Sequence, residues 1–350
     1  MSFNETFDLA PDYRISRVIR GGWQLAGGHG PVAQDAVSDD LQAFFDAGVT
    51  TFDCADIYTG VEEMIGAFRE RLRRTRGPEA LARLKVHTKF VPDLDLLPAI
   101  TAADVRRIID RSLQRLRTDR LDLVQFHWWD YDQPRYLEAA QALRTLQDEG
   151  KIQLIGGTNF DAAHMRDIAA AGVVFSTLQV QYSALDARPA GSLAAACEAL
   201  GVRLLCYGSL AGGFLSARWL GQPAPTGPLE NRSLVKYRLI IEEFGGWDLF
   251  QHLLQVLQAV ADRHGVSLSA VASRHVLDQP HVAAVIVGAR HAGHLPATLA
   301  IEDLRLTARD RAEIGSVLSQ RAGPAGEVYA LERDRTGRHG AIMKYNLSAS

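Results

Sequence analysis

The stretch LKVHTKFVPDLDLLPAITAADVRRIIDRSLQRLRTDRLDLVQFH, residues 84–127, decides the fold. It begins with a short strand-like run at 84–90 and continues with an amphipathic segment at 102–117, which Thr101 is placed to cap. A second apolar run follows at 121–127. A strand, a helix and another strand in this order predict two parallel strands joined by a crossover helix.

The same unit repeats along most of the chain. We expect strands at 14–22, 50–55, 84–90, 121–127, 151–159, 176–182, 202–210 and 281–289. Helical patterns follow at 38–49, from near Val61, and at 102–117, 134–149, 161–171, 187–200, 247–264 and 293–301. Runs such as VAAVIV at 282–287 are apolar throughout, which is typical of strands buried on both faces. Eight repeats predict a single-domain α/β protein with a closed (β/α)8 barrel of the TIM type.

Two stretches interrupt this rhythm. Residues 214–246, after the seventh strand, contain GQPAPTGP and FGG and are expected to form a long irregular loop with a functional role. Residues 321–350 form a C-terminal tail that we expect over the barrel mouth, where it can close the pocket. The barrel itself is expected to occupy residues 14–320.

Composition narrows the class of protein. Of 350 residues, 47% are hydrophobic and 23% charged, and the net charge of −3 does not favour nucleic acid or an anionic membrane as a partner. The longest apolar run is far shorter than the ~20 residues that span a bilayer. The three cysteines, Cys54, Cys197 and Cys206, lack the spacing of a zinc site and fit a reducing compartment. We therefore expect a cytoplasmic protein without a metal, and the oligomeric state stays open.

Polar side chains stand where three successive strands end. Asp53, Lys89 and His127 end the second, third and fourth strands, and Tyr58 lies just beyond the second. We call these four residues the tetrad. Each alone could be a turn cap, a solvated strand end or a packed side chain. Because active sites of parallel barrels lie at the C-terminal ends of the strands, the four together favour a catalytic site.

The tetrad suits proton transfer to an oxygen. A tyrosine hydroxyl has a pKa of about 10, and we expect the Lys89 ammonium to lower it. Asp53 would hold that ammonium in place, and His127, as a hydrogen-bond donor, would orient a carbonyl oxygen beside Tyr58. The pattern predicts Tyr58 as a general acid in a preorganised polar pocket.

These residues lie in longer motifs. FDCADIYTGVEEMIG (52–66), VHTKF (86–90), LVQFHWWD (123–130) and GKIQLIGGTNF (150–160) resemble segments of the aldo-keto reductase superfamily, and the likeness extends over roughly residues 14–320. The resemblance implies that the tetrad is catalytic. It also implies reversible reduction of an aldehyde or ketone to an alcohol, by hydride transfer from NADPH with Tyr58 as the proton donor.

The resemblance also implies binding residues. Those for the cofactor are Gly22, Trp23, Thr158, Asn159, Gln179, Tyr207, Ser209, Leu210, Gly212, Gly288, Ala289, Arg290 and His294. Those for the substrate pocket are Trp23, Trp128 and Trp129. Arg290 suits the 2′-phosphate of NADPH because its guanidinium is a planar fork of donors. Ala297 and Thr298 depart from the family pattern, which leaves NADH open.

Rival readings remain. GHGPVA (28–33) satisfies a dinucleotide-binding fingerprint, but residues 23–26 separate it from the preceding strand and Pro31 lies inside it. A metal-dependent hydrolase using Asp53, His87 and His127 would lack an HxH pair. The remaining alternative from another class is a cofactor-binding regulatory subunit of the same superfamily, with little turnover. The substrate itself cannot be read from the sequence.

Overall fold

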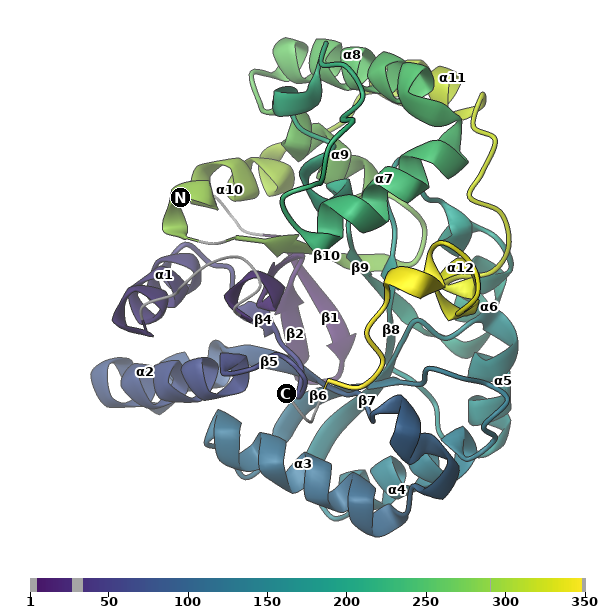
Figure 1. Cartoon of the computed structure of the whole chain (residues 1–350). Helices are drawn as coiled ribbons and strands as arrows, with labels where there is room; N and C mark the ends of the chain where they lie inside the picture. Colours follow the sequence, from purple (N-terminus) through teal and green to yellow (C-terminus); the bar gives the residue numbers. More distant parts are fainter. Residues whose placement is uncertain (1–4, 27–33, 290, 348–350) are drawn as a thin grey trace.

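The computed structural model describes residues 5–26, 34–289 and 291–347. Eight parallel strands close into a barrel that helices surround (Figure 1). In the barrel β10 lies between β9 and β3. The predicted (β/α)8 barrel is confirmed. In chain order the strands are β3 (Val18–Gly21), β4 (Thr51–Asp53), β5 (Lys85–Phe90), β6 (Leu121–His127), β7 (Ile152–Thr158), β8 (Thr177–Gln181), β9 (Arg203–Tyr207) and β10 (Val282–Gly288).

Helices surround the barrel. They are α1 (Gln34–Asp46), α2 (Val61–Arg83), α3 (Ala102–Leu116), α4 (Tyr136–Asp148), α5 (Ala162–Ala170), α6 (Ser192–Leu200), α7 (Arg232–Phe244), α8 (Gly246–His264), α9 (Leu268–Leu277), α10 (Leu295–Asp303), α11 (Ala308–Leu318) and α12 (Ala330–Arg333). In α3 the hydroxyl of Thr101 accepts from the amide of Asp104, whose side chain reaches back to the amide of Thr101. The predicted cap is thus half of a capping box.

The expected first strand, 14–22, corresponds to two separate strands, β2 (Tyr13–Ser16) and the barrel strand β3, which begins after Arg17. β2 pairs with the preceding strand β1 (Thr6–Ala10) in an antiparallel hairpin. Tyr13 and Ile15 of the hairpin pack against barrel residues such as Leu123 and Leu205, near the strand starts. The hairpin therefore covers the N-terminal end of the barrel. A surface hollow beside it is lined by residues 8 and 10–14 and by none of the tetrad.

The expectation of an irregular loop throughout 214–246 is wrong. Residues 232–244 form α7, which Asn231 caps by accepting from the amide of Leu234. Its apolar face, including Ile240 and Phe244, is buried. The sequence analysis also did not predict α9 and α11. Both pack against α8, and the three helices form a layer on this side of the barrel in which α9 contacts β10 directly.

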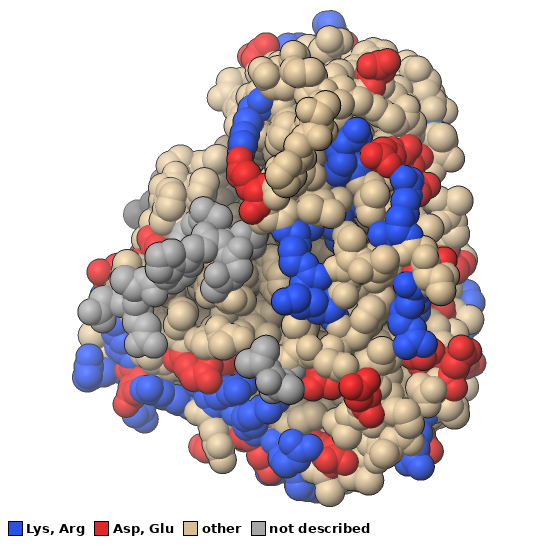
Figure 2. All heavy atoms as spheres, in the orientation of Figure 1, with Lys and Arg blue, Asp and Glu red and all other residues tan. Residues whose placement is uncertain are grey.

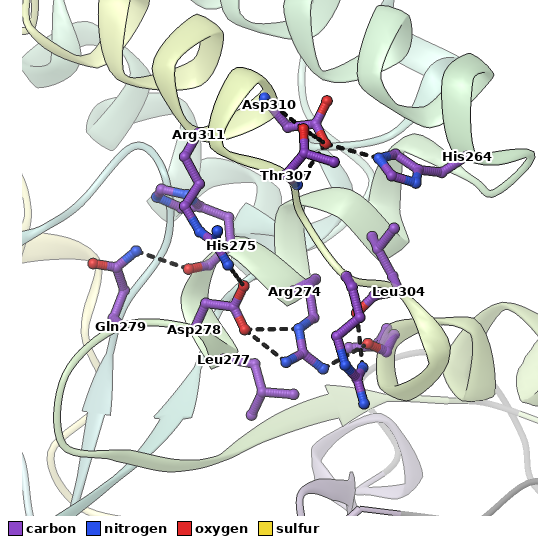
Figure 3. Close-up of polar contacts among 12 residues, drawn as sticks. His264, Arg274, His275, Leu277, Asp278, Gln279, Leu304, Thr307, Asp310 and Arg311 are labelled. Carbon is purple, nitrogen blue, oxygen red and sulfur yellow. Dashed lines mark hydrogen bonds and ion pairs between the residues drawn. The ribbon is translucent and has the colours of Figure 1, made fainter.

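Charged groups tie this layer together (Figure 3). Asp278 on α9 pairs with Arg274 at 2.7 Å and with Arg311 of α11 at 3.2 Å. Asp310 of α11 is buried and accepts from Arg263 at 2.6 Å and from His264 at 2.8 Å. It also completes a capping box with Thr307. Burial raises the pKa of Asp310, but the hydrogen bonds from Arg263, His264 and Thr307 outweigh this and hold the pKa well below its usual range.

Asp310→Asn should destabilise the protein in a pH-dependent way. A carboxyl whose pKa is depressed on folding stabilises the fold above its unfolded pKa of about 4, and this contribution is lost as the pH falls below that value. We expect the free energy of unfolding to drop by about 1–3 kcal/mol at pH 7, with a smaller difference at pH 3. Urea denaturation at both pH values measures this. Asp303→Asn, at an exposed site on α10, is the matched control; an equal loss in both variants would contradict the assignment.

Candidate active site

The barrel brings the tetrad together at the C-terminal ends of β4, β5 and β6. In the strand register Asp53 lies beside His87, and Lys89 lies beside Gln125. Asp53, Lys89 and His127 are all buried, and Tyr58 is half-buried in the loop after β4. The Lys89 ammonium lies 2.7 Å from Oδ2 of Asp53 and 5.1 Å from the centre of the Tyr58 ring.

Asp53 is the hub of this cluster. Its Oδ1 accepts from Nε2 of Gln179 at 2.7 Å and from Nε2 of Gln125 at 3.1 Å, while Oδ2 takes the Lys89 ammonium. Lys89 also donates to the carbonyl of Cys54 at 2.8 Å. The buried ion pair is therefore hydrogen-bonded on both sides. Sequence reasoning missed Gln125, although it lies two residues before His127 and so faces the same side of β6.

Tyr58 is less acidic than expected. Burial raises the pKa of its phenol above the ordinary value, and the Lys89 ammonium lowers it by less than burial raises it. The expectation of a lowered pKa is wrong for this structure. Burial alone would lower the pKa of Lys89, but the Asp53 carboxylate raises it overall. Near neutral pH the site therefore holds a protonated phenol beside a charged ammonium.

His127 is neutral and its tautomer is fixed. Burial and the charge of Arg333 lower the pKa of His127 to about 3. Its Nδ1 lies 3.0 Å from the carbonyl oxygen of Thr158, and a carbonyl can only accept, so Nδ1 carries the proton. Nε2, which is buried and has no hydrogen-bond partner among the described residues, is then an acceptor. The expected role of His127 as a donor to a carbonyl oxygen is wrong for this tautomer.

Groups that fit a nicotinamide lie at the ends of β7, β8 and β9. Oγ1 of Thr158 is buried and has no hydrogen-bond partner in the part of the chain that the structure describes, so it is available to a carboxamide. Asn159 adopts a left-handed conformation with φ of 60°, and its Oδ1 accepts from the hydroxyl of Tyr207 at 2.9 Å. Gln179 lies here too, bound to Asp53. The donors and acceptors present therefore suit an amide-bearing ring.

The segment after β9 is a tight turn of residues 208–213. Gly208 and Gly212 have positive φ, and a Cβ on either would come within 3 Å of Tyr237 on α7. Leu210 is partly exposed there, whereas the Ser209 hydroxyl is buried 3.0 Å from that of Ser273. The turn is therefore held close to α7, and only glycine fits at those two positions.

The other predicted cofactor residues are spread around β3 and β10. The amide of Gly22 donates to the carbonyl of Asp53 at 2.7 Å, and Trp23 stands edge-on to Tyr58 with 5.1 Å between ring centres. Gly288 ends β10 beside Gly21, and Ala289 is buried after it. The His294 ring stacks on that of His291, with 4.6 Å between ring centres, and the turn that contains both packs against α1. Arg290 and the GHGPVA segment (28–33) lie outside the described residues.

The two adjacent tryptophans have different fates. Side chains alternate along a strand and its extension, so His127 faces the barrel mouth while Trp128 points outward. Trp128 is completely buried, and its indole N–H donates to the carbonyls of Asp130 and Gln133. Its ring packs against Phe126 and Tyr136 rather than against the tetrad, and its place in the substrate pocket stays a prediction. Trp129 stays beside the tetrad, edge-on to His127 with 4.3 Å between ring centres.

The C-terminal tail lies across the mouth. The Tyr329 ring meets His127 edge-on at 5.6 Å, and Nη2 of Arg333 donates to the carbonyls of Asn159 and Trp128. Glu332 is buried and pairs with Arg188 at 3.1 Å. Sequence reasoning missed Arg188 and Glu332, because nothing local marks an ion pair between residues 144 positions apart.

Comparison with known proteins fits this geometry. A sequence model described as the Aldo/keto reductase family matches residues 17–319. The chain belongs to that family. Family membership makes it an oxidoreductase. None of the helices in the described ranges is both long and apolar enough to cross a membrane.

Individual relatives are distant. Aldo-keto reductase YhdN of Bacillus subtilis (strain 168) is 28% identical over 311 residues, covering 87% of this chain and 90% of its own. Flagellar radial spoke protein 5 of Chlamydomonas reinhardtii is 30% identical over 260 residues, or 64% of this chain, and the match spans 49% of the algal protein. The solved glycerol dehydrogenase of Gluconobacter oxydans superposes with a TM-score of 0.76 at 24% identity, over 92% of this chain and 97% of that one. This last likeness is one of fold.

Arg188→Met should release the tail. The change leaves Asp186 and Glu332 buried without their shared cation, and breaking a buried pair costs about 3–5 kcal/mol. We expect faster proteolytic cleavage within residues 321–347 and a lower unfolding temperature, measured by mass spectrometry of digests and by thermal denaturation. Arg335→Met, at an exposed tail position, is the control. Equal cleavage rates in the two variants would show that the ion pair does not hold the tail.

Proposed function

We propose that this family member reversibly reduces an aldehyde or ketone to an alcohol, with NADPH as the hydride donor and Tyr58 as the general acid. The observation that carries the proposal is the buried Lys89–Asp53 pair, 2.7 Å apart, with the Tyr58 ring 5.1 Å from the ammonium. An alkoxide-like oxygen formed at this place would take its proton from the Tyr58 hydroxyl. The ammonium would then stabilise the phenolate left behind.

The residues have separate tasks in this scheme. Tyr58 holds a proton on its hydroxyl oxygen because burial keeps its pKa high. Lys89 carries a charge that is fixed by Asp53, so no reorganisation is needed when negative charge develops on the phenol. His127, with Nε2 as an acceptor, would receive a hydrogen bond from a hydroxyl, which suits the alcohol side of the reaction. Trp129 and Tyr329 pack around His127 and exclude water.

Thr158, Asn159 and Gln179 would hold the carboxamide of the cofactor, and Tyr207 would stack on its ring. The turn with Ser209, Leu210 and Gly212 would hold the pyrophosphate, and Gly288, Ala289, Arg290 and His294 the adenosine end. When bound, the dihydronicotinamide supplies a hydride to the carbonyl carbon. The preference for NADPH over NADH rests on Arg290, and a cytoplasmic location stays part of the proposal.

A second candidate comes from the likeness to a radial spoke protein. The chain would then bind NADPH as a partner subunit and turn over little. Tight cofactor retention, with negligible consumption of NADPH on every aldehyde of a broad panel, would favour this candidate over the enzyme.

Tyr58→Phe should remove most carbonyl reduction and leave NADPH affinity nearly intact. Loss of a general acid typically costs about 10²–10⁴-fold in rate. We expect a fall of this size in kcat with 4-nitrobenzaldehyde, while the Kd for NADPH, followed by fluorescence titration, changes less than about threefold. Turnover like that of the wild type in the variant would refute the role of Tyr58.

Reduction should be nearly independent of pH between 6 and 9. The pKa of His127 is about 3, so the ring stays neutral throughout, and the raised pKa of Tyr58 keeps the phenol protonated beyond pH 10. The rate should fall only at higher pH, when Tyr58 loses its proton. The pH profile of kcat/KM tests this, and a limb near pH 6.5 would show that His127 titrates with its ordinary value.

A further inference from the structure

A lysine that the tetrad does not account for faces the mouth from α7. The Lys236 ammonium lies 5.5 Å from the ring centre of Tyr207, 5.6 Å from that of Tyr237 and 5.5 Å from that of Tyr329. Only 15% of its side-chain surface is exposed. Tyr207 is the proposed nicotinamide-stacking residue, and Tyr329 meets His127. The ammonium is thus enclosed by aromatic rings next to the place where a substrate would lie.

The Lys236 ammonium pairs with Glu332 at long range, and this carboxylate partly offsets the burial that lowers the pKa of Lys236. Its carboxylate neighbour, Glu332, is 3.6 Å away, which is longer than a hydrogen bond. Glu332 already takes two shorter contacts from Arg188, at 3.1 Å and 3.3 Å. Ammonium donors of Lys236 therefore remain available to a further acceptor.

A second cation flanks the same ring. The guanidinium carbon of Arg333 lies 5.3 Å from the ring centre of Tyr329, and its Nη2 is bound to two backbone carbonyls. Within residues 5–26, 34–289 and 291–347 Arg333 forms no ion pair, and its Nε is buried without a hydrogen-bond partner, although its guanidinium lies 4.0 Å from the ring centre of Tyr131. Figure 2 shows basic side chains along one side of the hollow on this face.

We propose that Lys236 and Arg333 are specificity-determining residues that bind an anionic group of the substrate, so that the preferred substrate is a carbonyl compound carrying a carboxylate. The inference rests on the proposed function. With two cations beside the Tyr329 ring and Glu332 already bound to Arg188, an anion here gains charge-assisted hydrogen bonds. Aromatic rings of Trp23, Tyr58, Trp129 and Tyr329 frame the rest of the mouth and suit a planar, apolar body.

A matched pair of aldehydes tests the proposal. 4-Carboxybenzaldehyde and methyl 4-formylbenzoate have nearly the same shape and differ in charge. We expect the wild-type holoenzyme to favour the acid by at least about tenfold in kcat/KM, an advantage of about 1.4 kcal/mol. In Lys236→Met and in Arg333→Met the acid-to-ester ratio should fall by at least about tenfold, mainly through KM for the acid. Lys236→Arg should keep most of the preference.

Arg338→Met is the matched control, because Arg338 is a tail arginine whose charge is taken by Glu242 and Glu243. Its ratio should equal that of the wild type. A wild-type ratio of one or less, or a ratio that survives both Lys236→Met and Arg333→Met, would overturn the proposal. Calorimetric binding of 4-carboxybenzyl alcohol to the NADP-loaded protein separates the two proposals. Selective binding of this acid without any turnover would contradict the proposed enzyme activity and support the anion site.

Discussion

The site depends on one buried ion pair, between Lys89 and Asp53. Taking two charges out of water costs several kcal/mol each, and attraction between them offsets this only when the remaining lone pairs and protons are also satisfied. Here Gln125 of β6, Gln179 of β8 and the carbonyl of Cys54, directly after β4, satisfy them. Closure of the barrel is what gathers these donors around a single carboxylate. The proposed role of Tyr58 depends on this pair, because the Lys89 ammonium can stabilise a phenolate only if Asp53 holds it beside the ring.

Most of the barrel could be predicted from the sequence, because strands buried on both faces are apolar and the helices between them carry one apolar stripe. The reading failed where this contrast is weak. Residues 232–244 follow a segment rich in proline and glycine, so the helical spacing of Leu234, Tyr237 and Ile241 was overlooked. The run at 14–22 has no break in composition, and only the arrangement in space separates the hairpin from β3.

Strand ends revealed the tetrad, but environment decided how its members behave. No local signal in the sequence gives the degree of burial of Tyr58, so the charge of Lys89 was expected to dominate its pKa. The tautomer of His127 depends on the carbonyl of Thr158, which lies 31 residues away along the chain. The tail residues were equally hidden, because their partners come from β6, β7 and α7. Trp128 differs from its neighbours for a simpler reason: side chains alternate along the strand, so it packs on Phe126 and Tyr136 while His127 and Trp129 lie together.

The first and the last described segments of the chain lie at opposite ends of the barrel. The β1–β2 hairpin covers the strand starts, while the segment from Tyr329 to Tyr345 rests on the strand ends beside His127 and Trp129. The position of an affinity tag or fusion partner therefore matters. A tag joined to the N-terminal side would follow the hairpin at the closed end of the barrel, whereas a tag joined to the C-terminal side would lie close to the mouth and could obstruct the entry of ligands.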